Sequence, residues 1–169
     1  MSLTQPLIAE LQHEATNTQK LLERIPNDKM DWKPHPKSRS VHQLAIHLVK
    51  VVRWAQVIVD TDEVDITAQA PPAVPAPHAE DLVRLFLDAA QQSVNALERI
   101  TEEQLNDSWM MRRGEQVIIE MPKAAAIRNI CLNHLYHHRA QLGLYLRLLD
   151  VPIPGMYGPS ADEMEHFKE

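Results

Sequence analysis

Residues 133–141 of this 169-residue chain read Asn133-His134-Leu135-Tyr136-His137-His138-Arg139-Ala140-Gln141. Apolar residues on both sides of this stretch recur at intervals of three and four, which predicts one helix over residues 123–149. Pro152 and Pro154 follow the pattern and are expected to end the helix. His134 and His138 lie four residues apart, so both should project from one face with about 6 Å between their Cβ atoms. Two imidazoles placed in this way can bind the same ion.

The helical face that carries these histidines is predicted to point into the protein. Counted at 100° per residue, the same narrow stripe holds Ile127, Cys131, Gln141 and Tyr145. A histidine pair at this spacing is common, however. Two buried histidines with hydrogen-bond partners, or two exposed ones, would leave the same pattern, so the pair does not decide for a metal by itself.

Three more segments show helical periodicity and complete the expected fold. One spans 4–24, with Pro6 in its first turn. The next opens with Ser40 and Gln43, which match a capping box, and continues to residue 59. The last spans 79–100. With the helix over 123–149 they predict an all-α protein, a four-helix bundle with a long crossover between its second and third helices.

The segments between these helices contain strong turn and loop signals. Pro26 to Arg39 carries prolines at alternate positions and is predicted to be an ordered loop. The proline-rich stretch 71–77 is interpreted as a stiff crossover rather than a domain boundary, so 1–169 is expected to form a single domain. Residues 106–122 resemble a short β-hairpin that turns near Gly114, just before the fourth helix.

Composition narrows the class of protein. The net charge is −6, and no basic face of the kind that binds nucleic acid is visible. The long apolar patterns are interrupted by charge, so no membrane helix is expected. The N-terminus lacks the features of a signal peptide, which favours a cytoplasmic location. The one cysteine, Cys131, excludes an intramolecular disulfide and a multi-cysteine zinc site, and is interpreted as a buried structural thiol rather than a fourth ligand.

A third histidine strengthens the metal hypothesis. His47 lies well inside the second helix, at the edge of its apolar arc between Leu44 and Val51. A lone histidine in such a place is usually a hydrogen-bonded core residue. Three inward-leaning histidines on two helices are better explained by coordination. The remaining histidines occupy polar faces, a first turn, loops or the tail, and are weaker candidates: His13, His35, His42, His78, His137 and His166.

These motifs together resemble the DinB/YfiT-like family. The resemblance rests on His134-x-x-x-His138-Arg139-x-Gln141, on His47, on the loop Trp32-Lys33-Pro34-His35-Pro36-x-Ser38, and on the tail Val151-Pro152-x-Pro154-Gly155-Met156-Tyr157-Gly158-Pro159-Ser160. It covers essentially the whole chain. It implies a four-helix bundle, often a homodimer, with an open three-histidine site for one divalent metal. Carried over residue by residue, the ligands are His47, His134 and His138.

The resemblance does not fix the chemistry of the site. Imidazole ligands suit zinc or nickel, with iron and manganese as further options. Three ligands leave positions open for water or substrate, which favours a metalloenzyme acting on a small molecule. Related branches imply either an S-transferase that uses a low-molecular-weight thiol or a hydrolase. The alternative is a non-catalytic, metal-binding stress-response protein in which the ion only joins two helices.

No catalytic residue can be assigned from the sequence. Glu14 lies within the apolar stripe of the first helix, where an unpaired carboxylate would be costly. It could hydrogen-bond a ligand histidine or a bound water. Pairing with a neighbouring cation, or reaching solvent, is the favoured interpretation. Gln141 and Tyr145 are comparable candidates for contacts with the ligands, and either could equally be an ordinary core residue.

Overall fold

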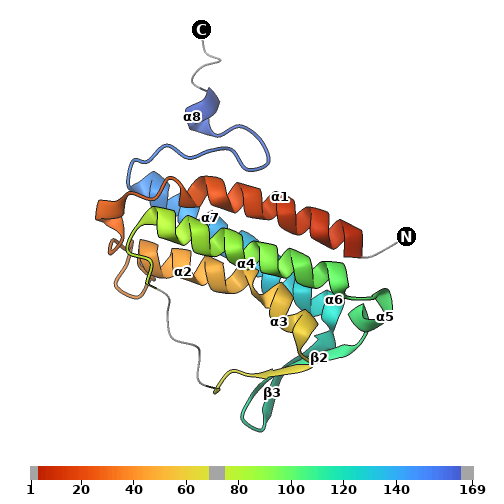
Figure 1. Cartoon of the computed structure of the whole chain (residues 1–169). Coiled ribbons are helices and arrows are strands. Elements are labelled where there is room, and N and C mark those ends of the chain that lie inside the picture. Colours follow the sequence, from red (N-terminus) through yellow and green to blue (C-terminus); the bar gives the residue numbers. More distant parts are fainter. Residues whose placement is uncertain (1–3, 69–74, 165–169) are drawn as a thin grey trace.

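The computed structural model of the chain describes residues 4–68 and 75–164, and it is mostly helical with one small sheet (Figure 1). The prediction of a predominantly helical chain with a β-hairpin before the last long helix is confirmed. The elements are α1 (Thr4–Leu22), the 3₁₀ turn η1 (Asn27–Lys29), α2 (Val41–Val52), α3 (Trp54–Asp60), β1 (Glu63–Asp65), α4 (Ala79–Arg99), α5 (Glu102–Leu105), β2 (Ser108–Arg113), β3 (Gln116–Pro122), α6 (Lys123–Ala126), the π-helix η2 (Ile127–Asn133), α7 (His134–Leu148) and α8 (Ala161–Met164).

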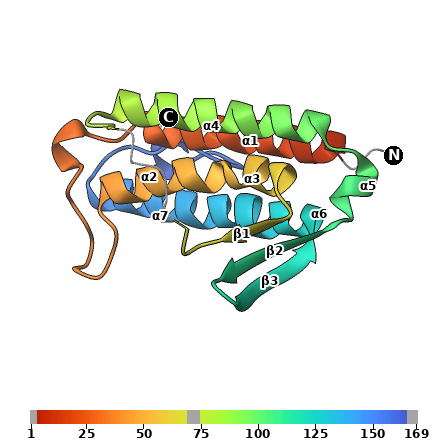
Figure 2. The same ribbon diagram turned by 60° about the horizontal axis from the view of Figure 1, so that its bottom comes forward.

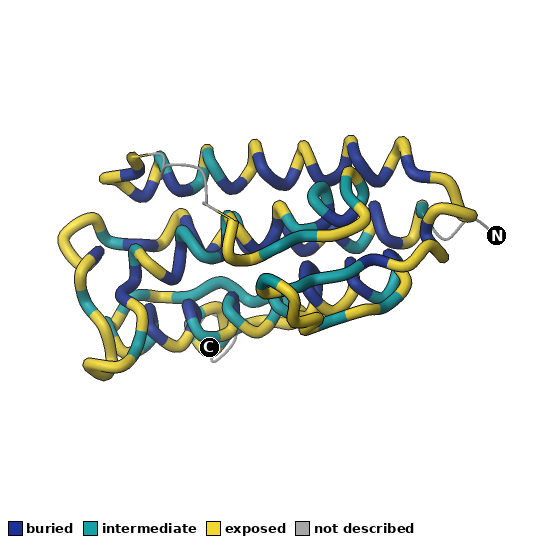
Figure 3. The backbone as a smooth tube through the Cα atoms, turned by 90° about the horizontal axis from the view of Figure 1, so that it is seen from below, coloured by how far each residue is buried: buried dark blue, intermediate teal, exposed yellow. Residues whose placement is uncertain are grey.

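The long helices lie alongside one another and share one apolar core. Helix α1 packs against α4, and α2 packs against both α4 and α7 (Figures 1 and 2). Buried positions follow the inward side of each helix, while the outward side is exposed (Figure 3). Large side chains from every long helix fill the interior, among them Leu11, Leu44, Leu48, Ile58, Phe86, Leu97, Leu142 and Leu146. The three- and four-residue spacing of the apolar residues thus identifies the faces that pack.

The helix predicted from Ser40 to residue 59 is interrupted, and Ser93 of α4 explains the break. The Ser93 hydroxyl, which is fully buried, donates to the Val52 carbonyl at 2.8 Å. The same oxygen accepts from the Gln56 N–H at 3.4 Å. The hydroxyl therefore stands between the two backbone groups that a continuous helix would join directly. Inserting a side chain into the i→i−4 ladder bends or breaks a helix, so α2 ends at Val52 and α3 begins at Trp54.

The start of α2 and the loop before it are as predicted. Ser40 accepts from the Gln43 N–H at 3.2 Å, and the Gln43 side chain accepts from the Ser40 N–H at 2.9 Å, which completes a capping box. The loop is ordered by backbone bonds. The Val41 N–H donates to the Trp32 carbonyl, and the His42 N–H donates to the Met30 carbonyl, both at 2.9 Å.

The predicted hairpin is confirmed as β2 and β3, which are antiparallel and pair Ser108 with Pro122 at their open end. No sequence pattern indicates the third strand. β1 pairs with β2 in parallel, so the order in the sheet is β1-β2-β3. The sheet is anchored to α3 by the fully buried Trp109, whose indole N–H donates to the Thr61 hydroxyl at 3.2 Å.

The segment predicted as one helix over 123–149 is helical without a break, but it is not α-helical throughout. Residues Ile127–Asn133 form a π-helix between α6 and α7. A π-helix has a wider turn than an α-helix, so it changes the phase of every side chain that follows. Counting 100° per residue is therefore inexact across this segment, although Ile127 and Cys131 are buried as predicted. Helix α7 ends at Leu148, and Asp150 beyond it adopts the left-handed conformation (φ 56°).

The proline-rich crossover is only partly described. Residues 71–74 of the predicted spacer lie outside the described residues, and so does His166. The part that the structure describes is held at the start of α4. His42 Nε2 lies 3.0 Å from the Ala76 carbonyl, and the Ala79 N–H donates to the Asn27 side chain at 2.8 Å. In the described portion of the chain, no helix is long and apolar enough to cross a membrane.

Candidate metal centre

Three histidines from two helices meet at one point. His47 lies on α2, while His134 and His138 lie one turn apart at the start of α7. The Nε2 atom of His134 is 3.2 Å from Nε2 of His47 and 2.9 Å from Nε2 of His138. One ligand atom from each ring lies within 4.8 Å of the other two, and all three residues are half-buried. The structure thus brings together the three residues singled out in the sequence.

The spacing of these nitrogens fits a shared ion. Zinc binds imidazole nitrogen at about 2.0–2.1 Å, which separates two tetrahedral ligands by about 3.3 Å and two adjacent octahedral ligands by about 2.9 Å. Both His134 contacts fall close to these separations. Neutral imidazoles that direct lone pairs at one another repel unless a cation or a proton lies between them. The donor set is therefore compatible with a divalent ion held by Nε2 atoms.

The electrostatics keep the three rings uncharged. Burial, followed by the charge of Arg39, lowers the pKa of His47 to about 4. Burial is also the largest cause that lowers the pKa of His134 and of His138. A ligand imidazole must be neutral to coordinate, so protons compete weakly for these nitrogens near neutral pH.

Hydrogen bonds orient two of the three rings. His138 Nδ1 lies 2.7 Å from the Gln141 side-chain oxygen, which can accept only from a protonated Nδ1. That tautomer leaves Nε2 unprotonated and facing the cluster. His134 is hydrogen-bonded to the backbone of Ile130, one turn earlier. Such bonds fix the orientation of a metal-binding histidine and raise its basicity, and Gln141 is the partner that the sequence had offered as a candidate.

The π-helix directly precedes the histidine pair. η2 ends at Asn133 and α7 begins at His134, so the change of phase occurs just before the first candidate ligand. Single π-turns inside helices are frequent at functional sites because they re-aim the side chains that follow. Here the pair at α7 faces His47 of α2, which the two helices bring into contact by packing on each other.

Each comparison with known proteins covers almost the entire chain. The sequence pattern of the DinB family matches residues 1–169. The chain belongs to the DinB family. The curated protein YrdA of Bacillus subtilis is 26% identical over 155 residues, which cover 91% of this chain and 87% of that protein.

Solved structures of DinB-like proteins share the fold. The protein YjoA of Bacillus subtilis superposes with a TM-score of 0.72 at 20% identity, covering 89% of this chain and 97% of that one. A DinB-like protein of Bacillus cereus superposes with a TM-score of 0.69 at 20% identity, covering 89% of this chain and 95% of that one. A putative DinB-family protein of Exiguobacterium sibiricum superposes with a TM-score of 0.62 at 24% identity, covering 87% of this chain and 91% of that one.

The other candidates of this DinB-family chain contact other partners. Glu14 is buried and paired with Arg139, as the favoured interpretation held. Tyr145 packs edge-on against Trp32, with ring centroids 5.6 Å apart. The Cys131 thiol is fully buried and lies 3.5 Å from the Val52 carbonyl; burial raises its pKa to about 12. It is a structural thiol.

The remaining described histidines do not join the cluster, although His137 touches its edge. Its exposed ring lies 4.8 Å from the His138 ring, and its Nε2 is 3.1 Å from the Gln141 side-chain nitrogen. The others contact neighbouring backbone or side chains, or lie on the surface: His13, His35, His42 and His78.

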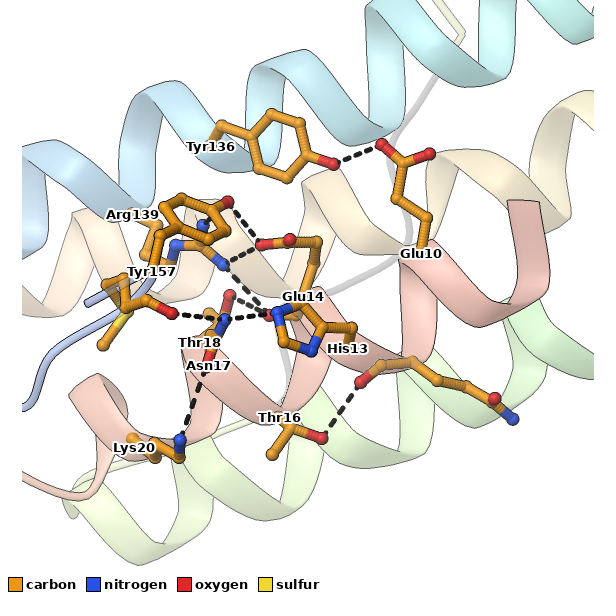
Figure 4. Close-up of polar contacts among 12 residues, drawn as sticks. Glu10, His13, Glu14, Thr16, Asn17, Thr18, Lys20, Tyr136, Arg139 and Tyr157 are labelled. Carbon is orange, nitrogen blue, oxygen red and sulfur yellow. Dashed lines mark hydrogen bonds and ion pairs between the residues drawn. The ribbon is translucent and has the colours of Figure 1, made fainter. Parts of the chain in front are cut away.

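Sequence reasoning placed Arg139 in the family motif but missed its role as the partner of Glu14. Its guanidinium is buried between α1 and the tail, where it binds Glu14 and donates to the Tyr157 hydroxyl (Figure 4). Tyr157 in turn donates to Glu14 at 2.8 Å. A signal was present in the sequence: a carboxylate and a guanidinium both stand at inward-facing helix positions, and buried charges require partners.

Proposed function

We propose that His47, His134 and His138 bind one divalent metal ion in a single four-helix-bundle domain that spans 1–169. The convergence of their three Nε2 atoms, at 2.9 and 3.2 Å along the two closest edges, carries this proposal. Zinc or nickel suits three imidazoles best, and iron or manganese is acceptable to the same donors.

The donor set favours an open site. Among the described residues, no carboxylate or thiol joins the three histidines to form a larger cluster. Structural zinc sites are usually closed by four protein ligands, whereas catalytic sites keep at least one position for water or substrate. When bound, a divalent ion supplies a Lewis acid that polarises a carbonyl or lowers the pKa of a coordinating nucleophile. We therefore favour a metal-dependent enzyme that acts on a small molecule.

Between the two expected reaction classes, thiol transfer is better supported than hydrolysis. A hydrolase usually needs a general base within hydrogen-bond reach of the attacking water. Glu14, the carboxylate proposed from the sequence, is held by Arg139 and Tyr157 instead. A low-molecular-weight thiol brings its own nucleophile, so the three histidines and Gln141 need only bind and orient it.

The second candidate is a non-catalytic stress-response protein with a structural metal. One observation favours it: the ligands come from α2 and α7, so an ion would tie together two helices that are far apart in the sequence. If the metal is structural, chelation should cause a large loss of stability. If the protein is an enzyme, it should turn over a thiol with an electrophile only when the metal is bound, and chelation should change its stability only modestly.

Metal analysis of the purified protein tests the central proposal. We expect one divalent ion per chain in the wild type and a strong loss of metal in His47→Ala and in His134→Ala. The matched control is His137→Ala, which removes an exposed histidine beside the cluster and should retain the ion. Equal metal content in all four proteins would refute the assignment.

We propose a homodimer that works in the cytoplasm without nucleic acid as a partner. The family likeness supports the homodimer, while the N-terminal sequence and the net charge of −6 support the location and the absence of nucleic acid. Sedimentation of the metal-loaded protein tests the oligomeric state, and a monomer at micromolar concentration would contradict it.

A further inference from the structure

A cavity of about 580 Å³ lies between α1, α7 and the tail that follows α7 (residues 151–164). Counted at 100° per residue, Gly143 in its wall is about 180° around α7 from His134 and about 140° from His138. The cavity therefore faces away from the candidate metal ligands. Apolar residues from all three segments form most of its wall, among them Leu21, Gly143, Leu144, Ile153, Pro154 and Met156.

The cavity exists because α7 carries small residues at this point. Gly143 is buried, and the nearest atom to a Cβ built on it is Cδ1 of Leu21, at 3.9 Å. Ala140, three residues earlier, also lines the cavity and is exposed. Residues at this spacing are neighbours on one face of a helix, so together they leave space that longer side chains would fill.

Polar contacts hold the tail in place over this space. The Asn17 side chain of α1 donates to the Met156 carbonyl at 3.2 Å. The Asp162 carboxylate accepts from the Ile153 N–H at 2.9 Å and pairs with Arg147 of α7 at 2.6 Å. The stretch from Ile153 to Met156 is thus fixed at both ends, and the cavity is preformed.

Both charged residues in the described lining already have a counter-charge. Arg139 binds the buried Glu14, and Arg147 binds Asp162. A charged ligand would lose its hydration in the cavity without finding a free counter-charge, which is costly. The lining therefore favours an uncharged ligand.

The two tyrosines of the lining offer a ligand their rings rather than hydrogen bonds. The Tyr136 hydroxyl donates to Glu10 at 2.6 Å, and the Tyr157 hydroxyl donates to Glu14 at 2.8 Å (Figure 4). Met156 beside them carries a thioether, which also packs favourably against aromatic rings. These three side chains suit an aromatic ligand.

We propose that this cavity is a second binding site, separate from the candidate metal centre, for an uncharged and largely aromatic small molecule. Its volume lies within the range of about 300–1,000 Å³ that is usual for small-molecule sites, and its wall has their mainly apolar character. Such a ligand replaces loosely held water by apolar contacts, which favours binding. The proposal does not depend on the proposed metal site.

The test compares two fluorescent probes that share one aromatic skeleton and differ in charge. N-phenyl-1-naphthylamine is uncharged, whereas 1-anilinonaphthalene-8-sulfonate carries a sulfonate on the same rings. Each probe is titrated into the purified wild type, and its fluorescence, which rises in apolar surroundings, is followed. We expect the uncharged probe to saturate at one molecule per chain and to bind at least about tenfold more tightly, because the sulfonate finds no free counter-charge.

Matched variants locate the bound probe. Ala140→Phe places a phenyl group in the cavity and should weaken binding of the uncharged probe at least about tenfold. Ala9→Phe adds the same group at an exposed position of α1 outside the cavity and should leave binding unchanged. His134→Ala should also leave it unchanged, since His134 lies on the other side of α7.

Two results of these titrations would overturn the inference: equal affinity of the wild type for the two probes, or unchanged binding of the uncharged probe in Ala140→Phe. Sedimentation of the same variants tests for a different occupant. Dissociation of a dimer in Ala140→Phe but not in Ala9→Phe would show that a second copy of the chain covers the cavity, and would overturn the inference as well.

Discussion

Glu14 of α1 and Arg139 of α7 form an ion pair in which both side chains are buried. Tyr157 completes it by accepting from Arg139 and donating to Glu14. The cluster joins two helices and the C-terminal tail, which Asn17 also holds through the Met156 carbonyl at 3.2 Å (Figure 4). Arg139 immediately follows His138. Successive residues of an α-helix lie about 100° apart, so the ion pair fixes a different face of α7 from the one that carries the candidate metal ligands.

Removing one charge of this pair should destabilise the fold strongly. Glu14→Gln leaves the Arg139 guanidinium buried without a counter-charge, and breaking a buried pair in this way costs about 3–5 kcal/mol. Tyr157→Phe is the milder control, because it removes one hydroxyl from the cluster and should cost about 1 kcal/mol. Urea unfolding at pH 7 measures both.

The double variant Glu14→Leu with Arg139→Met distinguishes an uncompensated charge from lost packing. Apolar replacement of both partners is often close to neutral, so the double variant should be more stable than Glu14→Gln alone. A loss in the double variant as large as the sum of two single losses would show that the pair itself, and not the stranded charge, provides the stability.

Gln141 should tune metal affinity without being a ligand. Gln141→Leu removes the oxygen that accepts from His138 Nδ1, and loss of such a partner usually weakens metal binding about 10–100-fold. Gln141→Glu keeps an acceptor in the same place and should retain most of the affinity. Competition with a chromogenic chelator measures both constants. Equal affinity in Gln141→Leu and the wild type would mean that the 2.7 Å contact does not orient the ring.

The sequence predicted the candidate site better than the path of the chain that builds it. His134 and His138 could be paired because four residues bring side chains onto one face of any α-helix. His47 could be added because it stands beside apolar residues that must face the core. The π-helix over Ile127–Asn133 has no comparable sequence signal, because its residues also suit an ordinary helix.

Other features were missed because they arise from tertiary contacts. Nothing near Val52 predicts an interrupted helix, since the cause is the Ser93 hydroxyl about forty positions away. Likewise, the three residues of β1 form a strand only because β2 offers a free edge. For Glu14 the sequence favoured either pairing with a cation or exposure to solvent, and the choice between them depended on the packing of α1 against α7.

Ser93→Ala should reveal the energetic role of the interrupted helix. Without the hydroxyl, the buried Val52 carbonyl and the Gln56 N–H lose a shared partner, which should cost about 1–2 kcal/mol. Ser108→Ala, at an exposed serine of β2, is the control and should change stability by less than about 0.5 kcal/mol. Urea unfolding compares the two. Unchanged stability in Ser93→Ala would indicate that the helix closes directly once the hydroxyl is gone.

Asp65 should contribute stability that disappears in acid. Hydrogen bonds from Thr67 and Gly114, together with the charge of Arg112, lower the pKa of Asp65 from 3.8 to about 2. A carboxyl with a lowered folded-state pKa stabilises the protein above its unfolded pKa and loses that effect as the pH falls through the folded value. The wild type should therefore lose stability relative to Asp65→Asn between about pH 4 and pH 2.

Urea unfolding at several pH values gives this difference directly. Asp88→Asn, at an exposed position on α4, provides the control and should follow the wild-type curve. Parallel curves for the wild type and Asp65→Asn across this range would contradict the role of Asp65 in joining β1 to the hairpin.

The hairpin turn provides a test of backbone conformation separated from packing. Gly114 has φ +58°, and a Cβ built there meets nothing within 4 Å, so Gly114→Ala should lose stability through the backbone alone. The expected loss is about 1 kcal/mol, and Gly114→Asn should lose less because asparagine tolerates the left-handed region. Gly158 also has open space around its Cβ position but no positive φ, so Gly158→Ala should be nearly neutral. Equal urea midpoints for Gly114→Ala and Gly158→Ala would mean that the turn relaxes to another conformation, and the register of β2 against β3 would then shift with it.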